Sequence, residues 1–115
     1  MIFVIDDDRI MASCIANAID GNTMVFGNGI SAMEEIANGK IPDMIFLDIL
    51  LDGPDGFTFL NELVSYGDTA KIPVVVVTSL ELKGKDLFTY GIVGVLSKDT
   101  MKPKDIQRYV EQYAK

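Results

Sequence analysis

The sequence predicts an α/β fold, a doubly wound sheet of five parallel strands with helices on both faces. Short apolar runs recur along the chain, and segments with helical spacing or turn residues separate them. Uninterrupted runs of this length are typical of strands buried on both faces. Strands that alternate with helices indicate a parallel sheet with right-handed crossovers, and the five-stranded form has the order 2-1-3-4-5. The four clearest runs are Ile2–Ile5, Met44–Leu47, Val74–Val77 and Val93–Leu96.

Five strands are expected, each bounded by turn residues. The apolar runs define four of them, and a shorter stretch from Thr23 to Phe26 defines the weaker second strand. Gly21 and Asn22 form a turn before that strand, and Pro73 opens the fourth. The expected strands cover residues 1–6, 23–26, 43–48, 73–78 and 93–97.

Helices are expected wherever apolar residues return every three or four positions. Ser31 begins the second helix, because Glu34 stands three residues later as in a capping box. The third helix turns Phe57 and Leu60 toward the core, and Pro103 suits the first position of the last helix. The expected helices cover residues 8–19, 31–38, 57–66, 85–90 and 103–113.

Composition narrows the possible functions. The 115 residues are expected to form one domain, residues 1–115. A net charge of −7 argues against direct nucleic-acid binding, which needs a basic face. There is no apolar stretch near the roughly 18 residues of a membrane span and no leader at Met1, so we expect a cytoplasmic protein without membrane contact. Cys14, the single cysteine, is expected to be a small buried residue.

Polar side chains stand at the ends of the predicted strands. Asp6 and Asp7 follow the first strand, Asp48 follows the third, Thr78 ends the fourth, and Lys98 follows the fifth. Ligands of open parallel sheets bind at the carboxyl ends of the strands, so these side chains are expected to meet at one edge. Carboxylates there suit Mg²⁺, which prefers oxygen ligands and commonly shares them with a phosphate.

This set of residues suits phosphoryl transfer to a carboxylate. Asp48 is the expected nucleophile, because it stands alone on the central strand and faces an acidic pair better arranged to hold a metal. Lys98 would supply a cation and Thr78 a hydroxyl for the charge that develops on the phosphoryl oxygens. The chain has no histidine, which excludes a histidine base, a histidine metal ligand and a phosphohistidine.

The chain resembles, over its whole length, the receiver domains of two-component response regulators, which have the flavodoxin-like or CheY-like fold. The resemblance rests on a set of short segments at the strand ends, together with the pair Asp55-Gly56. These segments are Val4-Ile5-Asp6-Asp7-Asp8, Ile45-Phe46-Leu47-Asp48-Ile49, Val76-Val77-Thr78-Ser79 and Leu96-Ser97-Lys98.

The resemblance implies a phosphorylation switch and not a turnover enzyme. Asp48 would accept a phosphoryl group from a sensor histidine kinase or a histidine phosphotransfer protein, and a downstream protein or effector domain would receive the signal. The implied Mg²⁺ ligands are Asp6, Asp7, Asp48 and the backbone carbonyl of Leu50. The implied phosphoryl-contacting residues are Thr78 and Lys98.

Two of the four departures from the family pattern bear on the switch itself. Val95 stands where the family often has a Tyr or Phe that moves inward on activation. Asp99 stands where the family has a cis-proline after the lysine, and we expect a trans bond because a cis bond before a non-proline residue is costly.

Two other functions remain open at this point. A degenerate receiver would serve as a phosphate-independent interaction module, which Val95 and Asp99 mildly favour. A phosphatase of the haloacid dehalogenase type would share Asp6-x-Asp8, a strand-end threonine and a later lysine. That family needs a further acidic pair and usually a cap, for which 115 residues leave no room.

Overall fold

The computed structural model describes residues 1–49, 56–79 and 91–114. The strands are β1 (Ile2–Ile5), β2 (Thr23–Phe26), β3 (Met44–Leu47), β4 (Val74–Thr78) and β5 (Ile92–Ser97). The helices are α1 (Arg9–Ala18), α2 (Gly29–Ala37), α3 (Gly56–Val64) and α5 (Pro103–Tyr113). The helix expected over residues 85–90 lies outside the described residues.

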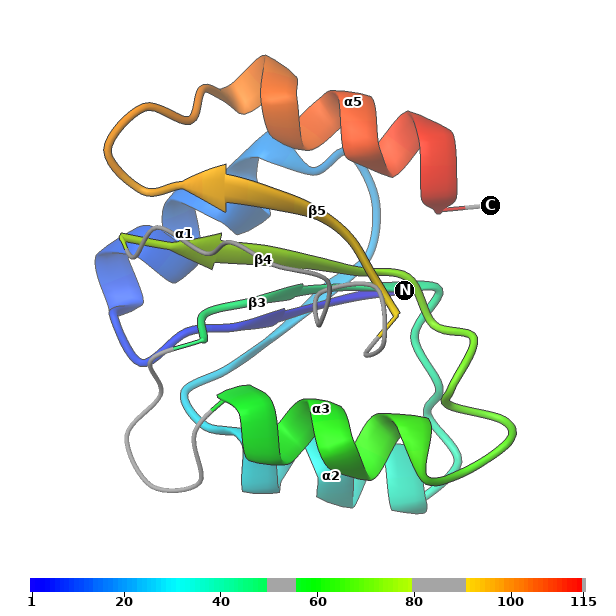
Figure 1. Cartoon of the computed structure of the whole chain (residues 1–115). Coiled ribbons are helices and arrows are strands. Elements are labelled where there is room, and N and C mark those ends of the chain that lie inside the picture. Colours follow the sequence, from blue (N-terminus) through cyan, green and yellow to red (C-terminus); the bar gives the residue numbers. More distant parts are fainter. Residues whose placement is uncertain (50–55, 80–90, 115) are drawn as a thin grey trace.

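The five strands form one parallel sheet in the order β2-β1-β3-β4-β5. This confirms the predicted fold class and strand order. All the strands run in the same direction across the molecule, so their carboxyl ends share one edge of the sheet (Figure 1). The strand order reverses between β1 and β3, and this is where ligands bind in sheets of this type.

Two helical layers cover the sheet (Figure 1). Helices α1 and α5 pack on one face, where Val4 and Phe46 meet Ile15 and Ile106. Helices α2 and α3 pack on the other, where alternate strand residues such as Phe3 join Phe59, Leu60 and others. Every residue of β1, β3 and β4 is buried, which explains why their apolar runs are uninterrupted.

Helix starts follow the capping residues. Asp8 caps α1, since its carboxylate accepts hydrogen bonds from the amides of Ile10 and Met11 at 3.0 and 3.2 Å. The predicted start of α2 at Ser31 is wrong. The cap is Asn28, whose side chain accepts a hydrogen bond of 2.8 Å from the Ser31 amide, so α2 begins two residues earlier.

Two side chains expected to face inward point outward. Cys14 is exposed, and Phe57 is 38% exposed while Phe59 fills the core. Ile10 of α1 is also exposed, by 79%. Helix α1 carries apolar residues of its own on several sides, so their spacing along the sequence did not identify the face that is buried. That face carries small residues such as Ala12, which let the helix lie close to the sheet.

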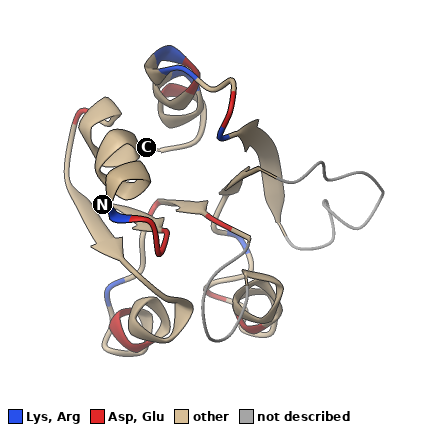
Figure 2. Cartoon of the chain, turned by 90° about the vertical axis from the view of Figure 1, so that its left-hand side faces the viewer, with Lys and Arg blue, Asp and Glu red and all other residues tan. Residues whose placement is uncertain are grey.

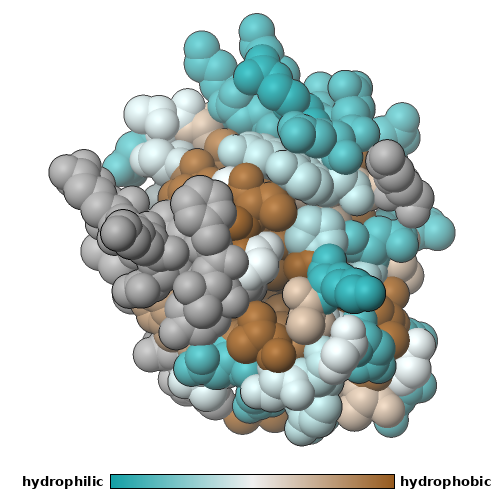
Figure 3. Space-filling model, turned by 45° about the vertical axis from the view of Figure 1, so that its right-hand side comes forward, coloured by the Kyte–Doolittle hydropathy of each residue, from teal (hydrophilic) through white to brown (hydrophobic). Residues whose placement is uncertain are grey.

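The face seen in Figure 3 carries polar residues with hydrophobic patches between them. In Figure 3, α5 forms a hydrophilic region at the top, and brown patches lie lower on the same face. Along the described ranges, no helix combines the length and the hydrophobicity needed to cross a membrane.

Gly56 brings the start of α3 against the end of β3. Its amide donates a hydrogen bond of 3.0 Å to the carbonyl of Ile49. A Cβ atom at Gly56 would lie 2.6 Å from the Cα of Ile49 and 3.0 Å from the carbonyl oxygen of Asp48. Only a residue without a side chain fits here, because the opposing atoms belong to the backbone and cannot rotate away.

Replacing Gly56 by alanine is therefore expected to destabilise the domain by about 1–3 kcal/mol, the usual range for overpacking. The shift in the urea unfolding midpoint measures the loss. Gly67→Ala is the matched control, because a Cβ atom there would meet nothing within 4 Å. Equal midpoints for the two variants would show that α3 can shift away from β3 at little cost.

Candidate functional site

The register between β1 and β3 places two carboxylates side by side. Ile5 pairs with Leu47, and one residue further on the amide of Asp48 donates a hydrogen bond of 2.9 Å to the carbonyl of Ile5. Asp6 and Asp48 thus leave the sheet at the same level, and they are only 2% and 4% exposed. Figure 2 views the molecule from this carboxyl edge, with acidic residues in red and basic residues in blue.

Lys98 follows β5, the edge strand, and its side chain reaches back toward these carboxylates. Its amide donates a hydrogen bond of 3.0 Å to the carbonyl of Thr78, so it continues the pairing between β4 and β5. Its Nζ atom lies 3.0 Å from Oδ2 of Asp48 and 3.1 Å from Oδ2 of Asp6. One ammonium group, at the end of β5, therefore contacts carboxylates at the ends of β1 and β3.

Asp7 and Thr78 complete the predicted set. Asp7 is exposed, and one oxygen from each of Asp6, Asp7 and Asp48 lies within 4.8 Å of the others. Thr78 is the last residue of β4, the strand beside β3, and it is buried. The structure thus brings the acidic residues and Lys98 together and places Thr78 at the same edge.

The Asp6 carboxyl group is held in an unfavourable environment. Burial raises its pKa above the ordinary value of 3.8, and the charge of Asp48 adds a smaller rise. The Asp8 amide, which donates a hydrogen bond of 2.9 Å to Oδ1 of Asp6, lowers that pKa in part, as does Lys98. Because the net direction is upward, the ionised carboxylate at neutral pH lacks some of the stabilisation that water would provide.

The Lys98 ammonium is stabilised in its charged form. Burial lowers its pKa, but the hydrogen bonds to Asp48 and Asp6 outweigh that effect, and the pKa is raised above 10.5. Lys98 is therefore a permanent cation at physiological pH.

One oxygen atom in the site is well suited to a cation. Oδ2 of Asp6 is buried and accepts no hydrogen bond from any residue that the structure describes, although the Lys98 ammonium is 3.1 Å away. Buried carboxylate oxygens are normally hydrogen-bonded. A hard divalent cation such as Mg²⁺ prefers oxygen ligands, so this donor set fits it.

The remaining expectations about the site concern the Leu50 carbonyl, the Lys98–Asp99 peptide bond and the contacts of Asp6. The backbone carbonyl of Leu50 lies outside the described residues. The Lys98–Asp99 peptide bond is trans, as expected. Asp6 and Lys98 lie at the same edge, as predicted, but two specific contacts of Asp6 were not predicted: the hydrogen bond from the Asp8 amide and the direct contact with the ammonium of Lys98, 92 positions away. The first could have been found, since a carboxylate two residues before a helix cap often accepts from its amide. No local signal predicts the second.

Comparison with known proteins agrees with this geometry. The family model described as "response regulator receiver domain" matches residues 2–111. The response regulator PleD of Caulobacter vibrioides is 34% identical over 91 residues, which are 79% of this chain and 18% of PleD. The chain spans between 7% and 34% of the length of the curated relatives compared with it.

Solved structures show the same fold. A putative response regulator from Chloroflexus aurantiacus superposes with a TM-score of 0.84 at 23% identity, over 96% of this chain and 93% of that one. The receiver domain of sensor histidine kinase PA1611 from Pseudomonas aeruginosa, solved with a magnesium ion in its active site cleft, gives a TM-score of 0.82 at 21% identity. The alignment covers 97% of this chain and 94% of that domain.

Asp6→Asn is expected to stabilise the domain at pH 7 when Mg²⁺ is chelated. A raised folded-state pKa means that the stabilisation from Asp6 is fully present below pH 3.8 and is lost as the pH rises through the folded value. Asparagine stays neutral throughout, so its advantage should grow with pH and then level off. Thermal unfolding from pH 4 to 8 in a chelator measures this difference.

Mg²⁺ should reverse that order of stability. At a free Mg²⁺ concentration of about a hundred times the dissociation constant, binding stabilises the parent by about 2.7 kcal/mol and the variant far less. Asp20→Asn, at an exposed position, is the control and should follow the parent. A parent that gains no more stability from Mg²⁺ than Asp6→Asn would argue against a metal site at Asp6.

Proposed function

The chain belongs to the response regulator receiver domain family, and from this premise we propose that Asp48 is its phosphoacceptor in a Mg²⁺-dependent switch. The observation that carries the proposal is the convergence of Asp48 and Asp6 on the Lys98 ammonium at 3.0 and 3.1 Å. A buried carboxylate beside a fixed cation can approach an anionic phosphoryl donor, because the cation offsets the repulsion between the two anions.

The proposed reaction transfers the phosphoryl group without a change in oxidation state. An oxygen of Asp48 attacks the phosphorus of a phosphohistidine on the donor. The phosphorus–nitrogen bond breaks, its electron pair stays on the imidazole, and that nitrogen takes a proton from water. The product is an aspartyl phosphate, which water later hydrolyses to the carboxylate and inorganic phosphate.

Three side chains would position the transferred group. Lys98 already contacts Asp48, so its ammonium can pair with the phosphoryl oxygens that replace the carboxylate charge. Thr78, at the neighbouring strand end, would donate its hydroxyl to another phosphoryl oxygen. The third, Asp6, would act through the metal ion that it would hold beside Asp48.

Asp6, Asp7 and Asp48 would hold the Mg²⁺, together with the backbone carbonyl of Leu50. When bound, the ion supplies positive charge that neutralises the phosphoryl oxygens during transfer. The receiver domain of PA1611 is described with a magnesium ion in its active site cleft, which supports the same choice of metal here. The buried Oδ2 of Asp6 supports it independently.

We also propose the partners that such a switch requires. A sensor histidine kinase or a histidine phosphotransfer protein would donate the phosphoryl group, because this chain has no histidine of its own. A downstream protein or a linked effector domain would receive the signal, and the site would lie in the cytoplasm. Direct binding to nucleic acid is disfavoured by the net charge of −7.

The two alternative functions differ in what supports them. Family membership favours a receiver over a phosphatase of the haloacid dehalogenase type. A degenerate receiver would not need a lysine held between two carboxylates, so the Lys98 contacts favour a working switch.

Incubation with acetyl phosphate and Mg²⁺ is expected to add one phosphoryl group, detected by mass spectrometry of the intact protein. Asp48→Asn should abolish the added mass, because an amide is not a nucleophile for phosphorus. Asp20→Asn is the control and should be labelled like the parent. Labelling that persists unchanged in Asp48→Asn would assign the phosphoacceptor to another residue.

Activation is expected to proceed without a ring that moves inward from β5. Val95 stands at the position where the family often has an aromatic residue, and it is a half-buried aliphatic residue against the α2–α3 core. Amide chemical shifts should therefore change most around Ser79 and Asp99 when a phosphoryl mimic and Mg²⁺ bind. Changes centred on Val95, with both of these positions silent, would contradict this expectation.

A further inference from the structure

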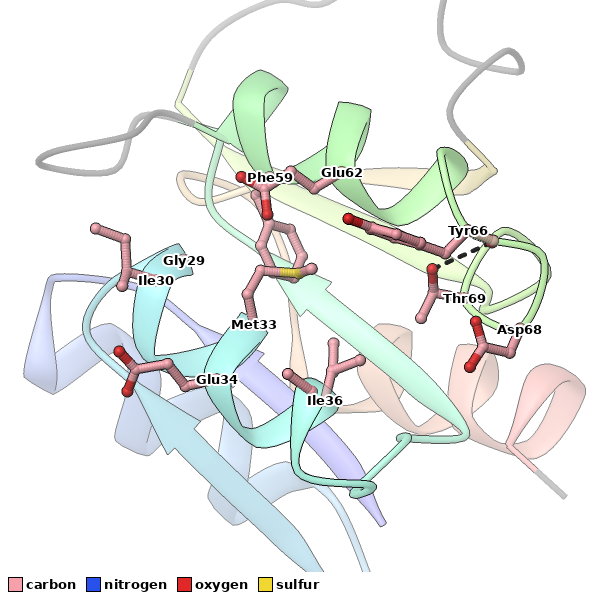
Figure 4. A pocket seen from close by; sticks show the side chains of 11 residues that line it. Gly29, Ile30, Met33, Glu34, Ile36, Phe59, Glu62, Tyr66, Asp68 and Thr69 are labelled. Carbon is pink, nitrogen blue, oxygen red and sulfur yellow. Dashed lines mark hydrogen bonds between the residues drawn. The ribbon is translucent and has the colours of Figure 1, made fainter.

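A groove lies between α2 and α3, on the face of the sheet opposite α1 and α5, and the proposed phosphorylation site does not use it (Figure 4). Its volume is about 620 Å³, well within the range of binding sites in proteins. We call it the α2–α3 groove. Its lining includes Ile30, Met33, Glu34, Phe59, Glu62 and Tyr66.

The floor of the groove is apolar and firmly held. Met33 and Phe59 approach each other across it from the two helices (Figure 4). Phe59 is buried, and its ring lies so close to α2 that a Cβ atom at Gly29 would be 3.2 Å away. Since this contact fixes the spacing of the two helices, the groove exists without a partner.

The rim of the groove exposes large apolar side chains to water. Ile30, in the first turn of α2, is 53% exposed, and Tyr66, just after α3, is 58% exposed. Ile30, Met33 and Ala37 recur at helical spacing along α2, so they form a ridge about 10 Å long at 1.5 Å per residue. That length accommodates two turns of a helix laid against it.

The charged side chains around the floor of the groove are all carboxylates among the residues that the structure describes. Glu34 stands on the α2 side, while Glu62 and Asp68 stand on the α3 side. Among the described residues that line the groove there is no lysine or arginine. A second copy of this chain would bring the same carboxylates together under a net charge of −7, so self-association through this groove is disfavoured.

We propose that the α2–α3 groove docks an amphipathic helix of a partner protein, with bulky apolar residues on one face and Lys or Arg on both flanks. Helices that lie in grooves insert apolar side chains at positions i, i+3, i+4 and i+7, which matches the spacing of the α2 ridge. The basic flanks would pair with the carboxylates on the two sides of the floor. The proposal does not depend on phosphorylation of Asp48.

The probe for this site is a synthetic helical peptide of about 15 residues, long enough to form a helix, with Leu and Phe on one face and Lys on both flanks. Fluorescence anisotropy at physiological salt measures its binding. The unmodified domain is expected to bind this peptide and to reject a version with Glu in place of every Lys.

Substitutions at exposed positions test the groove without disturbing the fold. Ile30→Ser and Tyr66→Ser should each weaken binding severalfold, and the double variant at least tenfold. Glu34→Gln with Glu62→Gln should weaken it and reduce its dependence on salt. The matched controls are Ile10→Ser, at an exposed isoleucine of α1, and Glu111→Gln, at an exposed glutamate of α5, and both should bind like the parent.

Several results would overturn the proposal. Equal affinity for the Glu peptide would show that the carboxylates beside the groove do not select the occupant. Equal weakening by groove and control variants would show that the probe binds elsewhere or is held only by overall charge. The absence of any binding would also overturn the proposal. A concentration-dependent dimer that Ile30→Ser and Tyr66→Ser abolish would assign the groove to a second copy instead.

Discussion

The structure of the site depends on one partly buried ammonium group between two buried carboxylates. Lys98 can contact Asp6 and Asp48 only if β1, β3 and β5 end at the same edge, which requires the parallel register of the whole sheet. Removing charges from water is costly, and their attraction repays the cost only when the geometry is good. The apolar strands provide that geometry, because β1, β3 and β4 are fully buried and are held in register by their parallel pairing.

The sequence allowed prediction of the strands, their order and the residues at the carboxyl edge. Those features are encoded locally, as an apolar run that ends in a polar residue such as Asp48 or Thr78. The strand ends and the predicted strand order place Lys98 and Asp6 at the same edge, but the direct contact between them is not encoded locally, because 92 positions separate the two residues. Which of the carboxylates the ammonium reaches depends on the packing of the folded sheet.

Errors arose where local patterns were ambiguous. Ser31 and Asn28 are both good capping residues, and only the path of the chain into α2 selects Asn28. Helix α1 is apolar on several sides, so the phase that buries Ala12 and exposes Ile10 is decided by how closely the helix approaches the sheet. In α3, Phe59 displaces Phe57 from the core because it faces α2 across a glycine. Each of these choices was settled by tertiary packing.

The division of the interior into two cores has a consequence for how this domain can vary. Alternate residues of β1, β3 and β4 belong to different cores, so Phe3 packs with α2 and α3 while its neighbour Val4 packs with α1 and α5. The backbone of the sheet is the wall between them. Substitutions in distant, separate clusters usually have additive effects on stability. The two helical surfaces can therefore diversify independently, and one can be redesigned as a module while the other keeps its original packing.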